Sequence, residues 1–142
     1  MGSHTLQARY LGEAARLVHS TPRVDMHIHY LYKDEPSSSR WQSGLMSVGG
    51  SAKPARRAFS LPLAQVSRRG LRTVLWGQVR PRSGRQRYIL QQFRSGKWRS
   101  VGGARRTSPR GHLTRTVRAG HGARFRIWYP AEKLASPLLR VR

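Results

Sequence analysis

One apolar, β-rich run stands alone among helical segments in the first half of the sequence, and it limits what this half can form. As a strand, the stretch from Arg23 to Tyr32 would place Val24, Met26, Ile28 and Tyr30 on one face and Asp25, His27, His29 and Leu31 on the other. A strand that is largely apolar on both faces is typical of a parallel sheet, where each strand needs hydrogen-bonded neighbours. Because residues 1–64 contain only one such run, we expect them to be a piece of a larger α/β fold.

Two helical segments flank this run. Apolar residues recur with helical spacing from Leu6 to His19, and Thr21-Pro22 ends the pattern. A second, shorter helix is expected over residues 54–59, before Leu61-Pro62. The first half therefore predicts an α-β-α unit.

The second half has the pattern of an all-β domain. Short alternating segments are separated by turn signals every 8–12 residues, which is typical of an antiparallel sandwich of the immunoglobulin (Ig) type. The expected strands cover residues 72–80, 86–94, 98–101, 112–118, 123–129 and 138–142, and residues 64–70 form the joint. The predicted fold class is α+β overall, with an incomplete α-β-α barrel fragment at 1–64 and an all-β Ig-like antiparallel sandwich at 65–142.

The charge of the chain favours an anionic partner. Lys and Arg total 28 against 5 Asp and Glu, a formal net charge of +23, and most of the excess lies after residue 60. Such a balance suits an anionic polysaccharide, a cell-wall polymer or nucleic acid. An excess of 24 Arg over 4 Lys also follows from GC-rich codon usage, which leaves the origin of the charge open.

Several classes of protein and site are excluded. There is no Cys, so disulfides and thiolate sites are absent. No apolar run reaches the roughly 18 residues that a membrane span needs. The first residues, MGSHTLQARYLGE, lack the apolar core of a signal peptide. Nucleotide-binding glycine motifs are also missing, and we expect no cofactor.

Four motifs in the first half resemble a known enzyme family. The segments QARYLGEAARLV, PRVDMHIHYLYKDEP, RWQSGL and GGSAKPARRAFSLPL are similar to the last helix–strand–helix of secreted bacterial (β/α)8 glycoside hydrolases of the retaining cellulase/xylosidase clan. The tail from residue 65 resembles the Ig-like or fibronectin-like modules that follow such enzymes. The resemblance implies an extracellular protein, if the chain belongs to a full-length enzyme. It also implies substrate contacts near the end of the strand, at His29, Tyr32, Asp34 and Trp41.

The resemblance does not supply catalytic residues. Retaining glycosidases need two carboxyl groups about 5–5.5 Å apart. In the clan these lie on strands that would precede Met1, and Glu13, Asp34 and Glu35 do not match them. We therefore expect a non-catalytic C-terminal portion of a carbohydrate-active enzyme, inactive alone. Its β module would act as a spacer or bind polysaccharide or anionic polymer weakly.

Two alternatives stay open. The first is a basic nucleic-acid-binding protein, since aromatic residues alternate with Arg in the second half. The second is a metal-dependent hydrolase, since Asp25, His27 and His29 form a D-x-H-x-H pattern in which the two histidines share one strand face. A catalytic metal would need at least one further ligand.

Overall fold

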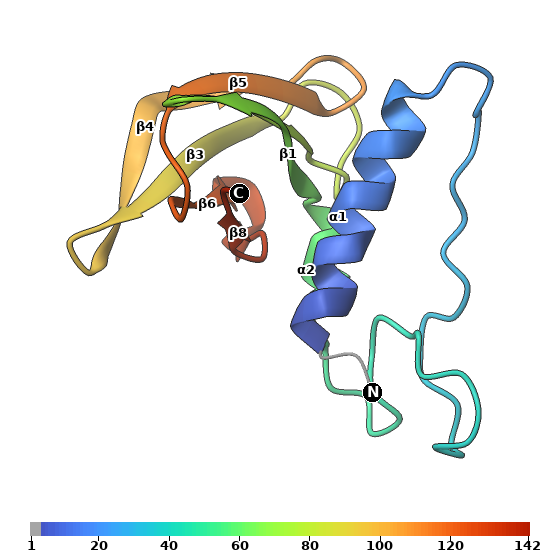
Figure 1. Ribbon diagram of the computed structural model, residues 1–142. Helices are drawn as coiled ribbons and strands as arrows, with labels where there is room; N and C mark the ends of the chain where they lie inside the picture. The colour runs from blue at the N-terminus through green and yellow to red at the C-terminus, as the bar shows by residue number, and fades with distance from the viewer. Residues whose placement is uncertain (1–3) are drawn as a thin grey trace.

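The computed structural model describes residues 4–142 and is mostly β. Its described part contains two α-helices and eight strands arranged in two antiparallel sheets (Figure 1). The helices are α1 (His4–Ser20) and α2 (Pro54–Ser60). The strands are β1 (Leu63–Arg69), β2 (Arg72–Gln78), β3 (Arg87–Arg94), β4 (Lys97–Arg106), β5 (His112–Arg118), β6 (Arg124–Tyr129), β7 (Leu134–Ala135) and β8 (Leu139–Arg140), with a 3₁₀ turn at Pro130–Glu132. Among the described residues, no helix is long and apolar enough to cross a membrane.

The two sheets share one hydrophobic core. One sheet has the order β1-β2-β5, and the other has the order β4-β3-β6-β7, with β8 also pairing with β6. Side chains alternate between buried and partly exposed along β3 and β6, as expected for strands with one face in a core. Leu75 of the first sheet and Leu90, Phe125, Ile127 and Tyr129 of the second are fully buried between them. Burying each of these side chains contributes about 1.5–3 kcal/mol.

The strands expected in the second half are all present, and two strands, β1 and the short β7, were not expected. β1 occupies most of the stretch predicted as a joint, residues 64–70. Only its first residues are buried, and its polar end, Ser67 to Arg69, is exposed. The turn between β3 and β4 is Ser95-Gly96, both with positive φ, which matches the two-residue hairpin that the sequence suggests.

Helix α1 packs through its small residues. Its buried positions are Ala8, Gly12 and Ala15, and it contacts α2 and β1. A Cβ at Gly12 would lie 3.0 Å from the carbonyl oxygen of Leu63, so the close approach of α1 to the sheet depends on this glycine. The helix stands between the two sheets and the chain segment that follows it (Figure 1).

The prediction of an α-β-α barrel fragment, and with it the α+β fold class, is wrong. Residues 24–30 run alongside α1 as an extended segment and form no strand (Figure 1). In the described residues before α2, β-bridges join only Lys33 to Met46 and Met46 to Ala52. The physical reason is that a strand exists only through its neighbours, and no described segment lies beside this one to pair with it. The division at residues 64 and 65 stays a prediction, and it falls inside β1.

Candidate anion-binding groove

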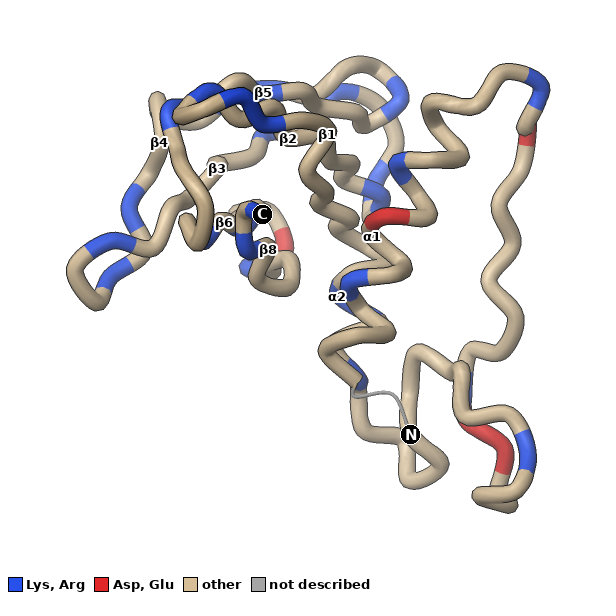
Figure 2. The backbone as a smooth tube through the Cα atoms, in the orientation of Figure 1, with Lys and Arg blue, Asp and Glu red and all other residues tan. Residues whose placement is uncertain are grey.

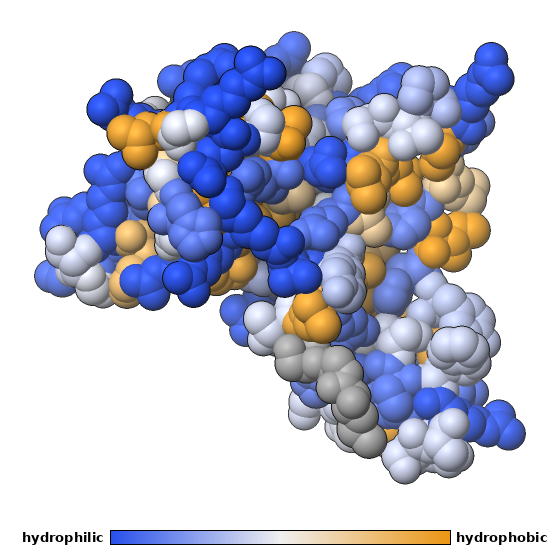
Figure 3. Space-filling model, in the orientation of Figure 1, coloured by the Kyte–Doolittle hydropathy of each residue, from blue (hydrophilic) through white to orange (hydrophobic). Residues whose placement is uncertain are grey.

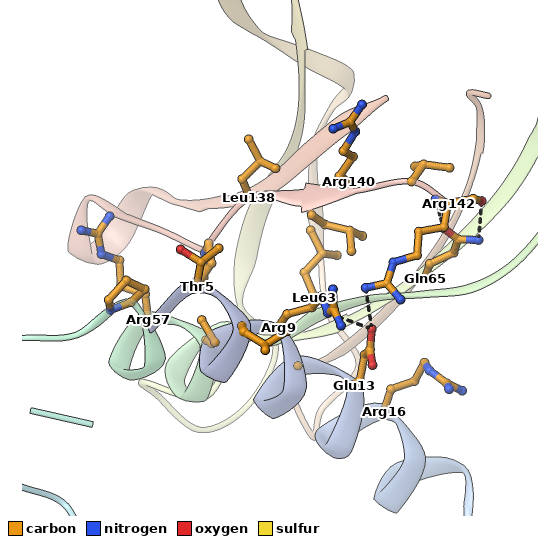
Figure 4. Close-up of a pocket in the computed structure, with 18 of the residues that line it drawn as sticks. Thr5, Arg9, Glu13, Arg16, Arg57, Leu63, Gln65, Leu138, Arg140 and Arg142 are labelled. Carbon is orange, nitrogen blue, oxygen red and sulfur yellow. Dashed lines mark hydrogen bonds and ion pairs between the residues drawn. The ribbon is translucent and has the colours of Figure 1, made fainter. Parts of the chain in front are cut away.

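A groove of about 1090 Å³ lies between α1, the start of α2 and the last residues of the chain (Figure 4). The sheet contributes Leu63 and Gln65 of β1 to its wall, and the C-terminal stretch contributes residues 137–142. Apolar side chains such as Leu138 and Leu139 alternate here with charged ones. The groove therefore joins the helical first half to the β part of the chain.

Five arginines line this groove, together with one carboxylate side chain. The arginines are Arg9, Arg16, Arg57, Arg140 and Arg142, and the carboxylate is Glu13. The Glu13 carboxylate lies 3.7 Å from Arg9 and 3.6 Å from Arg142, and both pairs are partly exposed. Figure 4 shows these three side chains converging, while Arg57 and Arg140 point elsewhere along the groove. One carboxylate cannot balance five cations, so the groove keeps a positive potential.

Three of the arginines form no ion pair within residues 4–142. Arg16, Arg57 and Arg140 have no acidic partner there. The Nε of Arg16 is buried and has no hydrogen-bond partner among the described residues. A buried N–H without an acceptor is costly, and this atom has essentially no exposed surface, so it does not face a ligand in the groove.

Two features place these arginines around one groove: their spacing on α1, and hydrogen bonds that hold the end of the chain against β1. Arg9, Glu13 and Arg16 have i, i+4, i+7 spacing, so they share one face of α1. The end of the chain is held against β1 by Gln65, which accepts from the Arg142 backbone N–H at 2.9 Å and donates to the Arg142 carbonyl at 3.3 Å. Arg68 Nε also donates to that carbonyl at 2.6 Å. These bonds bring Arg140 and Arg142 opposite the arginine face of α1.

The chemistry of the groove suits carboxylate, sulfate or phosphate groups. A guanidinium presents several N–H donors in a planar fork that can hold an oxyanion through two hydrogen bonds. The described lining contains no Phe, Tyr or Trp, and His121 is its one aromatic side chain, so it offers little surface on which a base or a sugar ring could stack. The groove therefore selects for charge rather than for an aromatic ligand.

Asp34, one of the residues expected to contact substrate, is part of a buried ion pair. The Lys53 ammonium lies 2.6 Å from its carboxylate, and both side chains are almost fully buried. Asp34 Oδ1 also accepts from the Gly44 N–H at 2.9 Å, and Lys53 Nζ donates to the Gln42 carbonyl at 2.9 Å. In this structure the carboxylate holds the loop between residues 33 and 53 together.

The other expected substrate-binding residues have different surroundings. His29 is half-buried, and its Nε2 is 2.9 Å from the Ser43 carbonyl. The Tyr32 ring is exposed, while its carbonyl accepts from two backbone N–H groups of the loop. Trp41 is exposed and lines a shallow depression with Tyr30 and with the Glu35–Arg40 pair, whose charged atoms are 3.7 Å apart. Of the four expected residues, only Trp41 lines this depression.

The D-x-H-x-H pattern does not gather a metal site. Within residues 4–142, no group of three or more His, Cys, Asp or Glu side chains is placed to hold a metal ion. Asp25 is exposed, and His27 is half-buried with no hydrogen-bond partner for its Nδ1 among the described residues. His29 uses one ring nitrogen for the loop.

A second group of arginines stacks on aromatic rings over the outer face of the larger sheet. The guanidinium carbon of Arg126 lies 4.3 Å from the Trp98 ring and 5.9 Å from the Trp128 ring, and that of Arg124 lies 4.1 Å from the Phe93 ring. Arg126 also donates to Gln91 Oε1 at 2.8 Å. These arginines are engaged by their own neighbours, unlike Arg16, Arg57 and Arg140 of the groove, which form no ion pair among the described residues.

Two histidines and a tryptophan pack where the end of α1 meets the first sheet. The His19 ring lies 4.1 Å from the His112 ring and 5.2 Å from the Trp76 ring. Burial lowers the pKa of His112 below its usual value, and the nearby charges of His19, Arg80 and Arg110 lower it further. The folded protein therefore favours the neutral imidazole at this contact.

Sequence reasoning missed the groove because its arginines come from three distant segments. Figure 2 shows basic residues spread over both sheets and helices, so no local cluster marks the site. The only local signal is the shared helical face of Arg9 and Arg16, seven residues apart. Comparison of the chain with protein-family models, with curated proteins and with solved structures finds no match, so the site is interpreted from its own geometry.

Proposed function

We propose that this chain is a non-catalytic part of a secreted carbohydrate-active enzyme and binds an acidic polysaccharide in the arginine groove. The observation that carries the binding proposal is that five arginines line one groove whose described lining holds a single carboxylate side chain. The enzyme context rests on the motif resemblance in residues 7–63. A non-catalytic role is supported by the carboxylates near those motifs, since Asp34 is buried against Lys53 and Glu35 is bonded to the Trp41 N–H.

An acidic polysaccharide suits the groove better than a nucleic acid does. Binding of single-stranded nucleic acid combines positive charge with stacking of bases on aromatic rings. Here Phe93 and Trp98 lie on the outer face of the larger sheet, where Arg124 and Arg126 stack on them. The rings of Tyr88, Phe125 and Tyr129 are buried in the core. A polymer of uronic acids carries one carboxylate on each sugar and needs only spaced guanidinium groups.

The experiment is a binding titration with three polymers at several salt concentrations. Polygalacturonate is the acidic polysaccharide, xylan is the neutral control, and double-stranded DNA tests the nucleic-acid alternative. The test variant is Arg57→Gln with Arg140→Gln, two groove arginines without an acidic partner. The matched control is Arg94→Gln with Arg99→Gln, two exposed arginines of the β3–β4 hairpin that do not line the groove. Both variants lose the same net charge.

We expect polygalacturonate to bind, xylan not to bind, and the affinity to fall linearly with the logarithm of the salt concentration. The groove variant should bind at least about tenfold more weakly and lower the slope by about two, while the control binds like the parent chain. Equal losses in both variants would show that the whole charge, and not the groove, attracts the polymer. Tighter binding of DNA than of polygalacturonate would favour the nucleic-acid alternative.

A further inference from the structure

The extended segment after α1 has a backbone with almost no hydrogen bonds. Within the described chain, no N–H or carbonyl group of residues 24–29 has a hydrogen-bond partner, and the Tyr30 carbonyl accepts only a long bond of 3.4 Å from Ser43. Arg23 and Leu31 bound the segment with positive φ values of 67° and 74°. Seven extended residues span about 24 Å. The segment is therefore an open edge, long enough to receive one strand.

This open edge also exposes large apolar side chains. Met26, Ile28 and Tyr30 are 72%, 77% and 68% exposed, and Val24 is 41% exposed. They occupy alternate positions, whereas His27 and His29 between them are half-buried. Figure 3 shows hydrophobic residues gathered over α1 and this neighbouring segment, in contrast to the hydrophilic surface of the sheets. Exposed apolar residues in such a row mark an interaction surface.

The local charge permits a second copy of the chain to approach here. Residues 24–30 hold one charged side chain, Asp25, so the local charge is −1, although the whole chain carries +23. In Figure 2 most of the extended segment carries no charged residue. Elsewhere on the molecule two copies would repel each other.

The segment is complementary to itself in the antiparallel direction. A pairing centred on His27 places Val24 opposite Tyr30 of the partner subunit and Met26 opposite Ile28 of the partner subunit. It also places Asp25 opposite His29 of the partner subunit, and the two bounding residues with positive φ then face each other. Apolar side chains therefore lie opposite apolar side chains, and Asp25, the one acidic residue of the segment, lies opposite His29 of the partner subunit.

We propose that residues 24–30 form a homodimer interface, in which the segments of two copies pair as antiparallel strands around a two-fold axis. The pairing supplies hydrogen-bond partners to one edge of each segment and sets each apolar side chain beside another. This interface is distinct from the arginine groove. Its salt dependence has the opposite sign, since salt screens the repulsion between two basic chains but weakens polyanion binding.

Sedimentation velocity over a range of concentrations at low and high salt tests the dimer. We expect a reversible dimer that strengthens with salt. Ile28→Lys should raise the dissociation constant of the dimer at least about tenfold, because it places a charge among the apolar side chains next to the two-fold axis. The matched control is Val66→Lys, an equally charged change at an exposed residue of β1, which should leave the constant unchanged. A chain that stays monomeric at every salt concentration and up to about 1 mM protein would overturn the proposal, because a dimer with a dissociation constant of about 1 mM would already be populated there.

Cysteine cross-linking tests the register, because the chain has no Cys of its own. A mixture of the Met26→Cys and Ile28→Cys chains should form a disulfide-linked dimer rapidly, since these positions face each other in the pair. Val24→Cys alone should cross-link slowly, because the two copies of residue 24 would lie about 20 Å apart. Equal rates for both samples would refute this pairing. The two proposals are tested separately. We expect the Ile28→Lys chain to bind polygalacturonate like the parent chain, and the groove variant, Arg57→Gln with Arg140→Gln, to dimerise like the parent chain.

Discussion

Replacing Asp34 with Ala tests whether this residue holds the loop rather than serving a ligand. The change leaves the Lys53 ammonium almost fully buried, with the Gln42 carbonyl as its remaining hydrogen-bond partner, and removes the acceptor of the Gly44 N–H. Removing one partner of a buried ion pair costs about 3–5 kcal/mol. Few bonds tie this loop to the sheets, so we expect the cost to appear as local opening of residues 33–53 and not as unfolding of the β part.

Amide hydrogen exchange measures that opening directly. At 3–4 kcal/mol, the exchange rates of the Gly44 and Leu45 amides should rise about 100- to 1,000-fold, while the amides of β3 and β6 keep their protection. The matched control is Arg40→Ala, which breaks the Arg40–Glu35 pair but leaves Glu35 and its bond from the Trp41 N–H in place, and it should change exchange only slightly. An Asp34→Ala chain whose loop amides exchange within about threefold of the parent would refute the reasoning, because a buried ammonium cannot lose its carboxylate without cost.

Three further predictions concern the β part. Phe125→Ala empties a fully buried site and should lower the free energy of unfolding by about 3–5 kcal/mol in urea; a loss below about 1 kcal/mol would contradict the core assignment. Arg126→Ala, which removes the cation stacked on Trp98, should cost about 1 kcal/mol without weakening polymer binding, and weaker binding would place the polymer on that sheet face instead. The folded state lowers the pKa of His112, so the unfolded state binds more protons, and the free energy of unfolding should fall as the pH drops through about 6.5. His112→Gln should flatten that fall, and an unaltered pH profile would contradict the assignment.

The strands of the β part could be predicted because their signals are local. Alternation and turn residues mark each of them, as at Ser95-Gly96, where both residues have positive φ. β1 escaped prediction because its second half is exposed and polar: Arg68 and Arg69 point to opposite faces of the strand, and neither is buried. Its place in the sheet depends on the register with β2, which local sequence does not contain.

The strand expected at residues 23–32 was wrong for a non-local reason. Its apolar alternation is real, and Met26, Ile28 and Tyr30 are among the most exposed large apolar side chains of the described residues. The sequence pattern indicated which faces would be apolar, but a strand also needs a neighbour, and no described segment supplies one. Helix α1 was predictable because the backbone hydrogen bonds of a helix form within the segment itself.

The sequence predicted the kind of ligand that the candidate site would bind, but not where the site lies. The excess of Arg indicated an anionic partner, but the groove itself forms when Arg140 and Arg142 are brought to α1 through the bonds of Arg142 with Gln65, 77 positions away in the sequence. The partner of Asp34 is likewise 19 positions distant, and no motif marks Lys53 as its counter-ion. Contacts of this range depend on the tertiary fold.

The most direct test of the central claim is a map of where polygalacturonate contacts the protein, recorded as changes in backbone amide NMR signals at low salt. The groove account predicts that the largest changes fall on α1 around Arg9 and Arg16 and on residues 137–142, and that added salt reverses them. Changes centred instead on the outer face of β3, β4 and β6, or spread evenly over all exposed arginines, would contradict it.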